Sequence, residues 1–244
     1  MRVTFLGAGD AFGSGGQNFS GYLVQAGERT FLLDCGPTAI IALKRIGFDP
    51  GKIDFVVLSH LHGDHFAGLP FFFLEYQYEH PRARPLVVAG PPGTEQRVRA
   101  VFRAMYRELA DRDLPFALRF EEMEPGRTQT IADVEIFPFR VPHQVEDVSL
   151  ALRVAANGKT VLYSGDTGWT EDLIRYSRGA DLAILECCYF DTQANFHLSY
   201  PQIREHRHRF ECCRLVLTHL GREVLARAAE VSEELAHDGL VIEP

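Results

Sequence analysis

The segment His60–His65 constrains this chain most, because it places four possible metal ligands within six residues. It reads HLHGDH and directly follows Phe55–Ser59, an apolar and β-branched run that predicts a buried strand. Imidazole nitrogens and carboxylate oxygens suit Zn²⁺ and similar borderline cations. A tight loop at the end of a strand can direct several such groups at one point, so we expect a metal site here.

Three further polar residues follow strand-like runs in the same way. His143, Asp166 and His219 each come directly after an apolar stretch. Any one of them alone is a weak signal, since such residues also cap or pack. Together with the first segment they make seven candidate ligands, which suffice for two adjacent metal ions. The seven are His60, His62, Asp64, His65, His143, Asp166 and His219.

Length and composition predict one soluble globular domain over residues 1–244. Hydrophobic residues make up 46% of the chain and charged residues 24%, which is ordinary for such a domain. No apolar run approaches membrane-spanning length, so we expect no membrane partner. The N-terminal segment Met1–Gly7 alternates like a strand and lacks the features of a signal peptide. We therefore expect a cytoplasmic protein.

The cysteines and the net charge narrow the function classes. Cys35 stands alone, and the other four form the adjacent pairs Cys187–Cys188 and Cys212–Cys213, in or beside apolar runs. This arrangement predicts reduced, structural cysteines. The formal net charge of −8 argues against broad, charge-driven binding of nucleic acid.

Strands and helices alternate along the chain, with hairpins and without a linker between the halves. This pattern predicts an α/β (α+β) fold in which two mixed sheets pack together under helices on both outer faces. We expect long helices over residues 94–109, with Thr94 at the N-cap, and over 222–237. An aromatic-rich helix over 70–78 either belongs to the core or forms a wall of a pocket near the metals.

The motifs also resemble a known family over almost the whole chain. The sequence is similar to the metallo-β-lactamase fold superfamily, and within it to the tRNase Z-like phosphodiesterase branch. The resemblance implies a four-layer αβ/βα sandwich and a metal-dependent hydrolase. It rests on the segments Phe5–Gly7, Leu32–Gly36, Leu58–Pro70, Ser164–Thr167 and Leu217–His219.

The resemblance also implies which residues hold each of two divalent metal ions. Zn²⁺ is the expected ion, and Mn²⁺ or Fe²⁺ also suit these ligands. Asp166 stands where dinuclear β-lactamases of the superfamily have a cysteine, which favours phosphodiester or ester hydrolysis. The first ion would take His60, His62 and His143, the second Asp64, His65 and His219, and Asp166 would bridge both.

The catalytic roles that follow from the resemblance involve a hydroxide between the two ions. Asp64 would orient or deprotonate the attacking water. His197 matches the position of a catalytic histidine in the branch and would protonate the leaving group, although Leu198 separates it from Ser199. Asp34 and Glu186 end predicted strands and either hydrogen-bond metal-bound histidines or satisfy local turns.

Two departures from tRNase Z bear on the substrate. Only residues 144–165 separate the third histidine motif from the bridging aspartate, so the tRNA-binding arm is missing. Residues 221–223 read GRE instead of the Ser-Arg-Tyr-like ending expected of tRNase Z. We therefore expect a small anionic substrate and not tRNA.

The expected function is a phosphodiesterase acting on a small or nucleotide-derived phosphodiester. The alternative is a lactone or thioester hydrolase with the same metal site. A metal-binding module or a di-iron redox protein forms a third class, but redox relatives generally carry a flavin domain for which 244 residues leave no room. The resemblance further suggests a homodimer.

Overall fold

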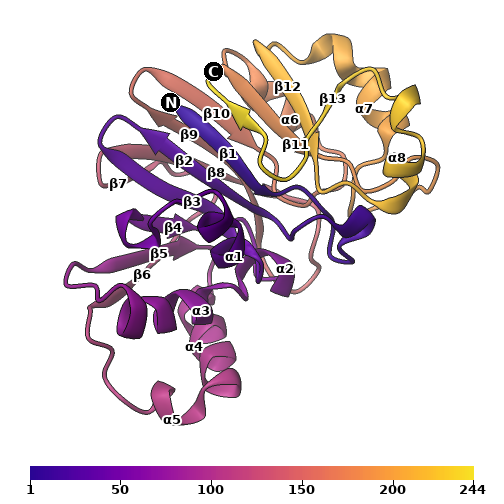
Figure 1. The fold of residues 1–244 in the computed structure, drawn as a ribbon. Helices are drawn as coiled ribbons and strands as arrows, with labels where there is room; N and C mark the ends of the chain where they lie inside the picture. Colours follow the sequence, from indigo (N-terminus) through magenta and orange to yellow (C-terminus); the bar gives the residue numbers. More distant parts are fainter.

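Two seven-stranded mixed sheets pack face to face in the computed structural model, which describes residues 1–244. Helices α1–α5 lie on the side of the first sheet, and α6–α8 lie on the side of the second (Figure 1). The four-layer sandwich predicted from the sequence is thereby confirmed. The helices are α1 (Ala39–Arg45), α2 (Gly63–Phe66), α3 (Leu69–Leu74), α4 (Thr94–Met105), α5 (Arg107–Ala110), α6 (Glu171–Ser177), α7 (Tyr200–His206) and α8 (Arg222–Ala226).

The two sheets repeat one plan, with antiparallel pairing in one half and parallel pairing in the other. The strands β1 to β3 and β7 to β10 pair antiparallel, whereas β3 to β6 and β10 to β13 pair parallel. In order, the first sheet contains β14 (Val241–Ile242), β1 (Arg2–Gly7), β2 (Gly21–Ala26), β3 (Arg29–Cys35), β4 (Phe55–Val57), β5 (Leu86–Gly90) and β6 (Leu118–Glu122). The second contains β13 (Glu234–Leu235), β12 (Arg214–Thr218), β11 (Leu182–Glu186), β10 (Lys159–Tyr163), β9 (Ser149–Ala156), β8 (Val134–Val141) and β7 (Gln129–Ile131).

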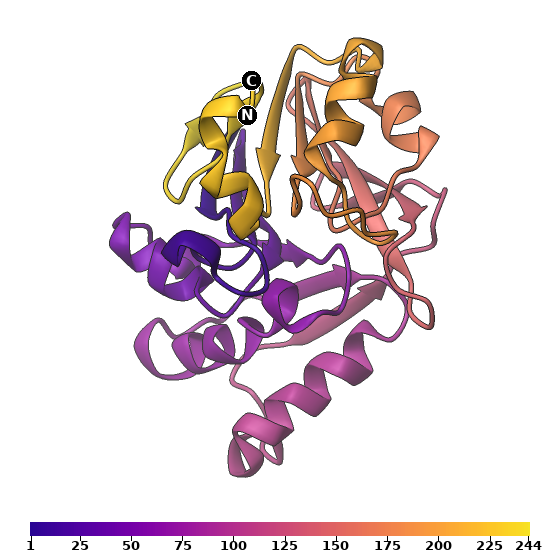
Figure 2. The same cartoon turned by 90° about the vertical axis from the view of Figure 1, so that its right-hand side faces the viewer.

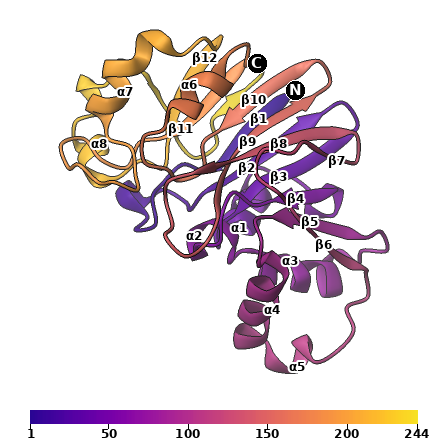
Figure 3. The ribbon, with the colours of Figure 1, turned by 180° about the vertical axis from the view of Figure 1, so that it is seen from behind.

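The end of the chain returns to its beginning. Strand β14 pairs antiparallel with β1, so the two termini lie close together (Figure 2). The first sheet therefore contains strands from both ends of the sequence. Helices α4 and α5 lie at the opposite end of the molecule from α7 and α8, as the view from behind also shows (Figure 3).

Alternation of side chains along the strands divides the core into three layers. In β3, Phe31 and Leu33 face the cluster between the sheets, while Leu32 belongs to the cluster under α1, α3 and α4. On the other side, Leu185 and Leu217 join the cluster under α6 and α7. Successive strand residues point to opposite faces, so strands buried on both faces become almost wholly apolar. This explains the continuous apolar runs in the sequence.

The predicted helix over 94–109 is wrong in its length and its cap. Helix α4 stops at Met105, because Tyr106 leaves helical geometry with φ −138° and ψ 62°. Its N-cap is Gly93 in the left-handed region, at φ 87°. The hydroxyl of Thr94 instead donates to the carbonyl oxygen of Pro91 at 2.6 Å.

The predicted helix over 222–237 is also wrong. Helix α8 ends at Ala226, and the chain then extends to form β13 beside β12. The amide of Ala236 donates to the carbonyl oxygen of Leu217 at 2.8 Å. The open edge of β12 offers unpaired backbone groups, and pairing with them takes precedence over helical periodicity.

The aromatic helix belongs to the core and not to a pocket wall. Phe72, Phe73 and Tyr76 are fully buried beside α1 and α4, whereas Tyr78 is exposed. Helix α3 continues as a π-helical turn over Glu75–Glu79. None of the helices combines the length and the hydrophobicity that crossing a bilayer requires.

The cysteines are all free, as the sequence predicts. Cys35, Cys187 and Cys188 are buried. Cys212 is half-buried and Cys213 is exposed, so a structural role in the core does not apply to Cys213.

Candidate metal centre

The polar residues that follow several strands converge at one edge of the sandwich. The segment after β4 and helix α2 supply four of them, and the ends of β8, β10 and β12 supply one each. They form two groups, and within each group the ligand atoms lie within 4.8 Å of one another. The first group is His60, His62, His143 and Asp166, and the second is Asp64, His65, Asp166 and His219. The structure thus brings together all seven predicted ligands, with Asp166 in both groups.

The distances between the ligand atoms suit coordination around a cation. In the second group, the Nε2 atom of His65 lies 3.2 Å from Oδ2 of Asp64 and 3.3 Å from Oδ1 of Asp166. The Nε2 atom of His219 lies 3.3 Å and 3.4 Å from Oδ2 of the same two aspartates. Ligands about 2.0–2.1 Å from a tetrahedral ion are separated by about 3.3 Å. The second group therefore has the dimensions of one coordination sphere.

In the first group the distances between ligand atoms vary more. The Nε2 atom of His143 lies 2.9 Å from Nδ1 of His62. The Nε2 atoms of His60 and His143 each lie 3.8 Å from Oδ2 of Asp166. Three imidazole nitrogens and one carboxylate oxygen thus surround a common point.

Several of these atoms are buried without a hydrogen-bond partner. They are Nε2 of His60, Nε2 of His65 and Oδ1 of Asp166. Burying a polar atom without a partner costs about 1–3 kcal/mol, so native proteins avoid it. All three atoms point into the cluster, where a cation would satisfy them. The residues therefore fit a divalent metal.

The protonation states of two histidines and of Asp166 also suit metal binding. Burial lowers the pKa of His60 well below its ordinary value and lowers that of His143 to about 4. Burial by itself would raise the pKa of Asp166, but the nearby His219 and His65 outweigh it and hold that pKa far below its usual range. Neutral imidazoles and an ionised carboxylate are the forms that coordinate metals.

Asp34 lies behind the ligand cluster and holds it in place through hydrogen bonds. Its fully buried carboxylate accepts hydrogen bonds from the amide of Ser59 at 2.7 Å and from the hydroxyl of Ser59 at 2.8 Å. It also accepts Nδ1–H of His65 at 2.7 Å and the hydroxyl of Tyr163 at 2.6 Å. Asp34 therefore fixes the ring of His65 with Nε2 directed at the cluster, the first of the two roles that the sequence left open.

Glu186 has a different partner from the one expected. Its buried carboxylate accepts Nδ1–H of His197 at 2.8 Å, and His197 is not in either group of predicted ligands. The ring of His197 lies 4.8 Å from that of His143 and 5.8 Å from that of His219, measured between centroids. Burial lowers the pKa of His197, but the hydrogen bond and charge of Glu186 outweigh it and raise the pKa to about 9. A protonated imidazole therefore stands beside both ligand groups.

Cys188 is a site residue that the sequence reasoning missed. Its sulfur and the nearest nitrogens of His197 and His219 lie within 4.8 Å of one another. The parallel register of β11 and β12 pairs Glu186 with Thr218, which places the residues just after these strands side by side. The sequence does not show that register, and the apolar surroundings of the cysteine favoured a purely structural role.

Close backbone approach at Gly36 brings helix α2 to the end of β3. A Cβ atom added at Gly36 would lie 2.4 Å from the carbonyl oxygen of Asp64. A Cβ atom added at Gly68 would lie 2.2 Å from the carbonyl oxygen of Gly36. Only glycine allows these contacts, which bring Asp64 and His65 to the cluster.

Comparison with known proteins identifies the family. Residues 1–236 of this chain match the sequence model of a family described as "Anti-Pycsar protein Apyc1". The chain belongs to the Apyc1 family. A relative in Mycobacterium leprae, an uncharacterized protein, is 32% identical to it over 90% of this chain and 78% of its own length.

Two solved structures have the same fold as this Apyc1-family chain. The metallo-β-lactamase fold protein YhfI from Bacillus subtilis is 26% identical, with a TM-score of 0.79 over 100% of this chain and 98% of its own. The short form of human tRNase Z is 25% identical, with a TM-score of 0.79 over 100% and 99%. Curated relatives are named a probable metallo-hydrolase in B. subtilis and ribonuclease Z in Mycobacterium bovis.

These findings confirm the resemblance to the metallo-β-lactamase fold and to its tRNase Z-like branch. They also confirm that the Apyc1-family chain is a metal-dependent hydrolase. The sequence reasoning did not single out the Apyc1 family within that branch.

Proposed function

We propose that this protein is a dinuclear metal phosphodiesterase acting on a small or nucleotide-derived phosphodiester. The observation that carries the proposal is the sharing of Asp166 by two ligand groups, with the ion pair of His197 and Glu186 beside them. In this proposal Zn²⁺ is the expected ion, and Mn²⁺ or Fe²⁺ suits the same ligands. His60, His62 and His143 would hold the first ion, Asp64, His65 and His219 would hold the second, and Asp166 belongs to both ligand groups.

The metals and the protein contribute different parts of the reaction. Two bound divalent ions would lower the pKa of a water molecule and draw charge from the phosphoryl oxygens. Asp64 would orient the attacking water, since its side chain is 10% exposed while those of His65 and His219 are buried. Burial favours the protonated form of Asp64, but His65 outweighs it and keeps the pKa of Asp64 far below its usual range. Asp64 is therefore available as an ionised acceptor.

His197 would complete the reaction by protonating the leaving alkoxide. Glu186 binds its Nδ1–H, so Nε2–H remains for the substrate. The side chain is 22% exposed, which leaves it accessible from the site. General acid catalysis by such a group typically contributes about 10²–10⁴-fold.

The size of the proposed substrate follows from the hairpin between the ligand loops. Strands β9 and β10 join at a tight turn around Asn157, which has φ 50°. No arm extends there toward a large nucleic acid, and the chain carries a net charge of −8. Both features support a small diester over tRNA.

Hydrolysis of a lactone or thioester is the second candidate, because the same ligands can activate water for attack on a carbonyl carbon. The position of His197 favours the diester. His197 matches the position of a catalytic histidine in the tRNase Z-like phosphodiesterase branch, and it lies beside the metal cluster.

The test is hydrolysis of bis(p-nitrophenyl) phosphate by Zn²⁺- or Mn²⁺-loaded protein. We expect turnover in the wild type and its loss in Asp64→Ala. Asp113→Ala, at an exposed aspartate remote from the cluster, serves as the control and keeps full activity. If the fully metallated wild type does not hydrolyse the diester but cleaves lactones or thioesters, lactone or thioester hydrolysis is the function instead.

A further inference from the structure

A third group of possible metal ligands lies beside the two groups described above. It consists of Cys188, His197 and His219, whose ligand atoms lie within 4.8 Å of one another. Of these three residues, only His219 also belongs to one of the first two groups. Thiolate sulfur and imidazole nitrogen are ligands that thiophilic cations such as Zn²⁺ prefer. The third group therefore has the chemistry of a site for a further cation.

Glu186 orients His197 in the way in which metal-binding histidines are usually oriented. Its buried carboxylate accepts Nδ1–H of His197 at 2.8 Å, so Nε2 remains for a ligand. The same carboxylate accepts the amides of Cys188 and Leu198 at 3.3 and 3.2 Å. A carboxylate bound to Nδ1–H fixes the ring and makes Nε2 a more basic ligand. Glu186 therefore holds two members of the third group in place.

His219 has one nitrogen left for a further ligand. Its Nε2 atom lies 3.3 Å and 3.4 Å from Oδ2 of Asp64 and of Asp166, so it belongs to the second ligand group. Its Nδ1 atom is buried and has no hydrogen-bond partner. Native proteins rarely leave a buried nitrogen without a partner. A cation held together with Cys188 would supply one.

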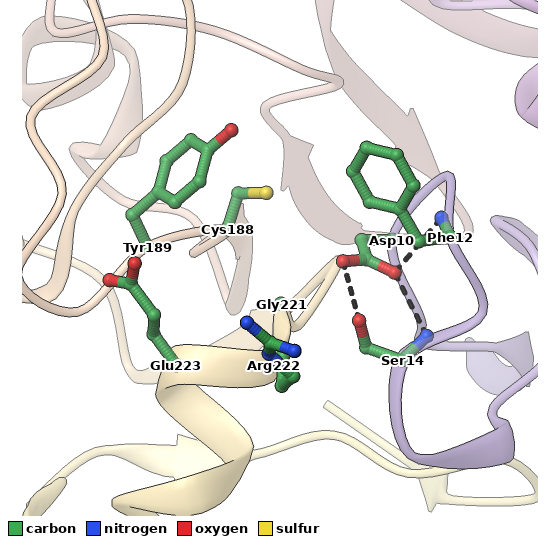
Figure 4. A pocket seen from close by; sticks show the side chains of 8 residues that line it. All are labelled: Asp10, Phe12, Ser14, Cys188, Tyr189, Gly221, Arg222 and Glu223. Carbon is green, nitrogen blue, oxygen red and sulfur yellow. Dashed lines mark hydrogen bonds between the residues drawn. The ribbon is translucent and has the colours of Figure 1, made fainter.

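A cavity of about 290 Å³ gives access to the third group (Figure 4). Cys188 lines this cavity, and its sulfur points into the space between Tyr189 and Phe12 (Figure 4). The side chain of His197 is 22% exposed. A cation can therefore reach the group from solvent, and a water molecule from the cavity can complete a four-coordinate shell.

We propose that Cys188, His197 and His219 bind a third, thiophilic divalent cation in addition to the two ions of the metal centre. Binding displaces three protons to the solvent, from the thiol of Cys188, from Nε2 of His197 and from Nδ1 of His219. The loss of these protons and repulsion by the two neighbouring ions make the third site weaker than the other two. It therefore fills only when the cation is in excess.

Occupation of the third site inhibits hydrolysis. The cation takes Nε2 of His197, the atom that the function proposed above assigns to protonation of the leaving alkoxide. The inhibition rests on that proposed function, whereas the binding of the cation does not. Inhibition is strong for a substrate that needs a proton donor and weak for one whose leaving group is stable as an anion.

Binding of Cd²⁺, a softer relative of Zn²⁺, tests the site without reference to activity. Protein loaded with two Zn²⁺ ions is titrated with Cd²⁺, and the ultraviolet charge-transfer band of the cadmium–thiolate bond is recorded. A Cys212→Ser/Cys213→Ser background removes the two thiols that are not buried. In this background we expect a saturable band, and we expect its loss when Cys188→Ser is added.

Two further variants separate the site from a general structural effect. Cys187→Ser is the matched control, because the sulfur of Cys187 donates to the carbonyl oxygen of Tyr189 at 3.8 Å and lies outside the third group, so the band should stay. His197→Gln should weaken Cd²⁺ binding about tenfold or more, since a nitrogen ligand is lost. The absence of a band in the background protein, its survival in Cys188→Ser, or unchanged affinity in His197→Gln would overturn the proposal.

Two thymidine diesters that differ in their leaving group test the inhibition. Thymidine 5′-(4-nitrophenyl phosphate) releases 4-nitrophenolate, which needs no proton donor, whereas thymidine 5′-(ethyl phosphate) releases ethoxide. In excess Zn²⁺ we expect kcat of the wild type on the ethyl ester to fall about 10²-fold, the contribution of a general acid, and kcat on the nitrophenyl ester to fall much less. Cys188→Ser should resist the excess. Equal inhibition on both esters would overturn the role of His197 in the third site.

Failure of the proposed function gives a different result. If the wild type hydrolyses neither diester, the phosphodiesterase proposal fails. The cadmium–thiolate band then decides about the third site alone: a band that requires Cys188 supports the site, and a band that does not require it overturns the site.

Discussion

Outside the two ligand groups, His197 is the residue on which the proposed chemistry depends most. We expect His197→Ala to lower kcat by about 10²-fold or more, because the leaving group loses its proton donor. Metal content should stay at the wild-type level, since His197 lies outside both groups of predicted ligands. Plasma emission analysis of the purified variant, alongside kinetics on a diester that releases an alkoxide, checks both points. Full activity in His197→Ala would remove this residue from the mechanism.

Asp34 tests whether the network behind the ligands tunes metal binding. In Asp34→Asn, an amide replaces one acceptor oxygen of a carboxylate that receives four hydrogen bonds, one of them from His65. We expect metal affinity to fall by about 10–100-fold, the usual effect of losing such a partner, as measured by competition with a chromophoric chelator. Asp181→Asn is the control, because Asp181 bonds the backbone of β10 far from the cluster. An unchanged affinity in Asp34→Asn would show that His65 is oriented without this partner.

Single residues also show what the sequence could predict about the site. Each of the seven ligands lies in a segment that follows an apolar run, so its placement follows from strand ends meeting at one edge. Cys188 and the partner of Glu186 depend on which strands lie side by side. Nothing local to the chain specifies that β11 and β12 are neighbours.

At the scale of elements, Glu223 connects helix α8 to the loop after β11. Hydrogen bonds from the hydroxyl and amide of Thr192, and from the amides of Asp191 and Phe190, lower the pKa of Glu223 to about 2. A carboxylate with a depressed pKa stabilises the fold above its unfolded pKa, and this stability is lost as the pH falls toward the folded pKa. Glu223→Gln should therefore have a lower Tm than the wild type at pH 7.

The pH dependence of the difference in Tm provides a further test of this prediction. The difference in Tm between wild type and Glu223→Gln should shrink steadily as the pH falls from about 5 toward 3, because Glu223 becomes protonated in the unfolded chain within that range. Thermal melts followed by circular dichroism at several pH values measure it. A difference that stays constant over this range would mean that the charge of Glu223 does not stabilise the loop.

Strands could be predicted better than helices. The apolar run over Phe55–Ser59 predicted β4, since burial on both faces leaves an unbroken hydrophobic signal. The helices over 94–109 and 222–237 were predicted too long. Tyr106 breaks the first, and pairing of β13 with the edge of β12 ends the second. Both outcomes depend on tertiary contacts that override local propensity.

At the scale of the whole molecule, the metal site joins the two halves of the sandwich. The segment after β4 and helix α2 belong to the first half, whereas His143, Asp166 and His219 extend from the second sheet. A metal ion that binds the folded protein and not the unfolded chain therefore stabilises the folded state. The repeated plan of the two sheets explains why similar strand-then-ligand patterns recur along the sequence.

A titration of metal-free protein shows whether two metal ions per chain support phosphodiester hydrolysis. Protein stripped with a chelator is reloaded stepwise with Zn²⁺ or Mn²⁺, and hydrolysis of bis(p-nitrophenyl) phosphate is followed at each step. We expect negligible turnover without metal and activity that saturates at two ions per chain. Full activity at one ion or none, or no turnover at two, would contradict it.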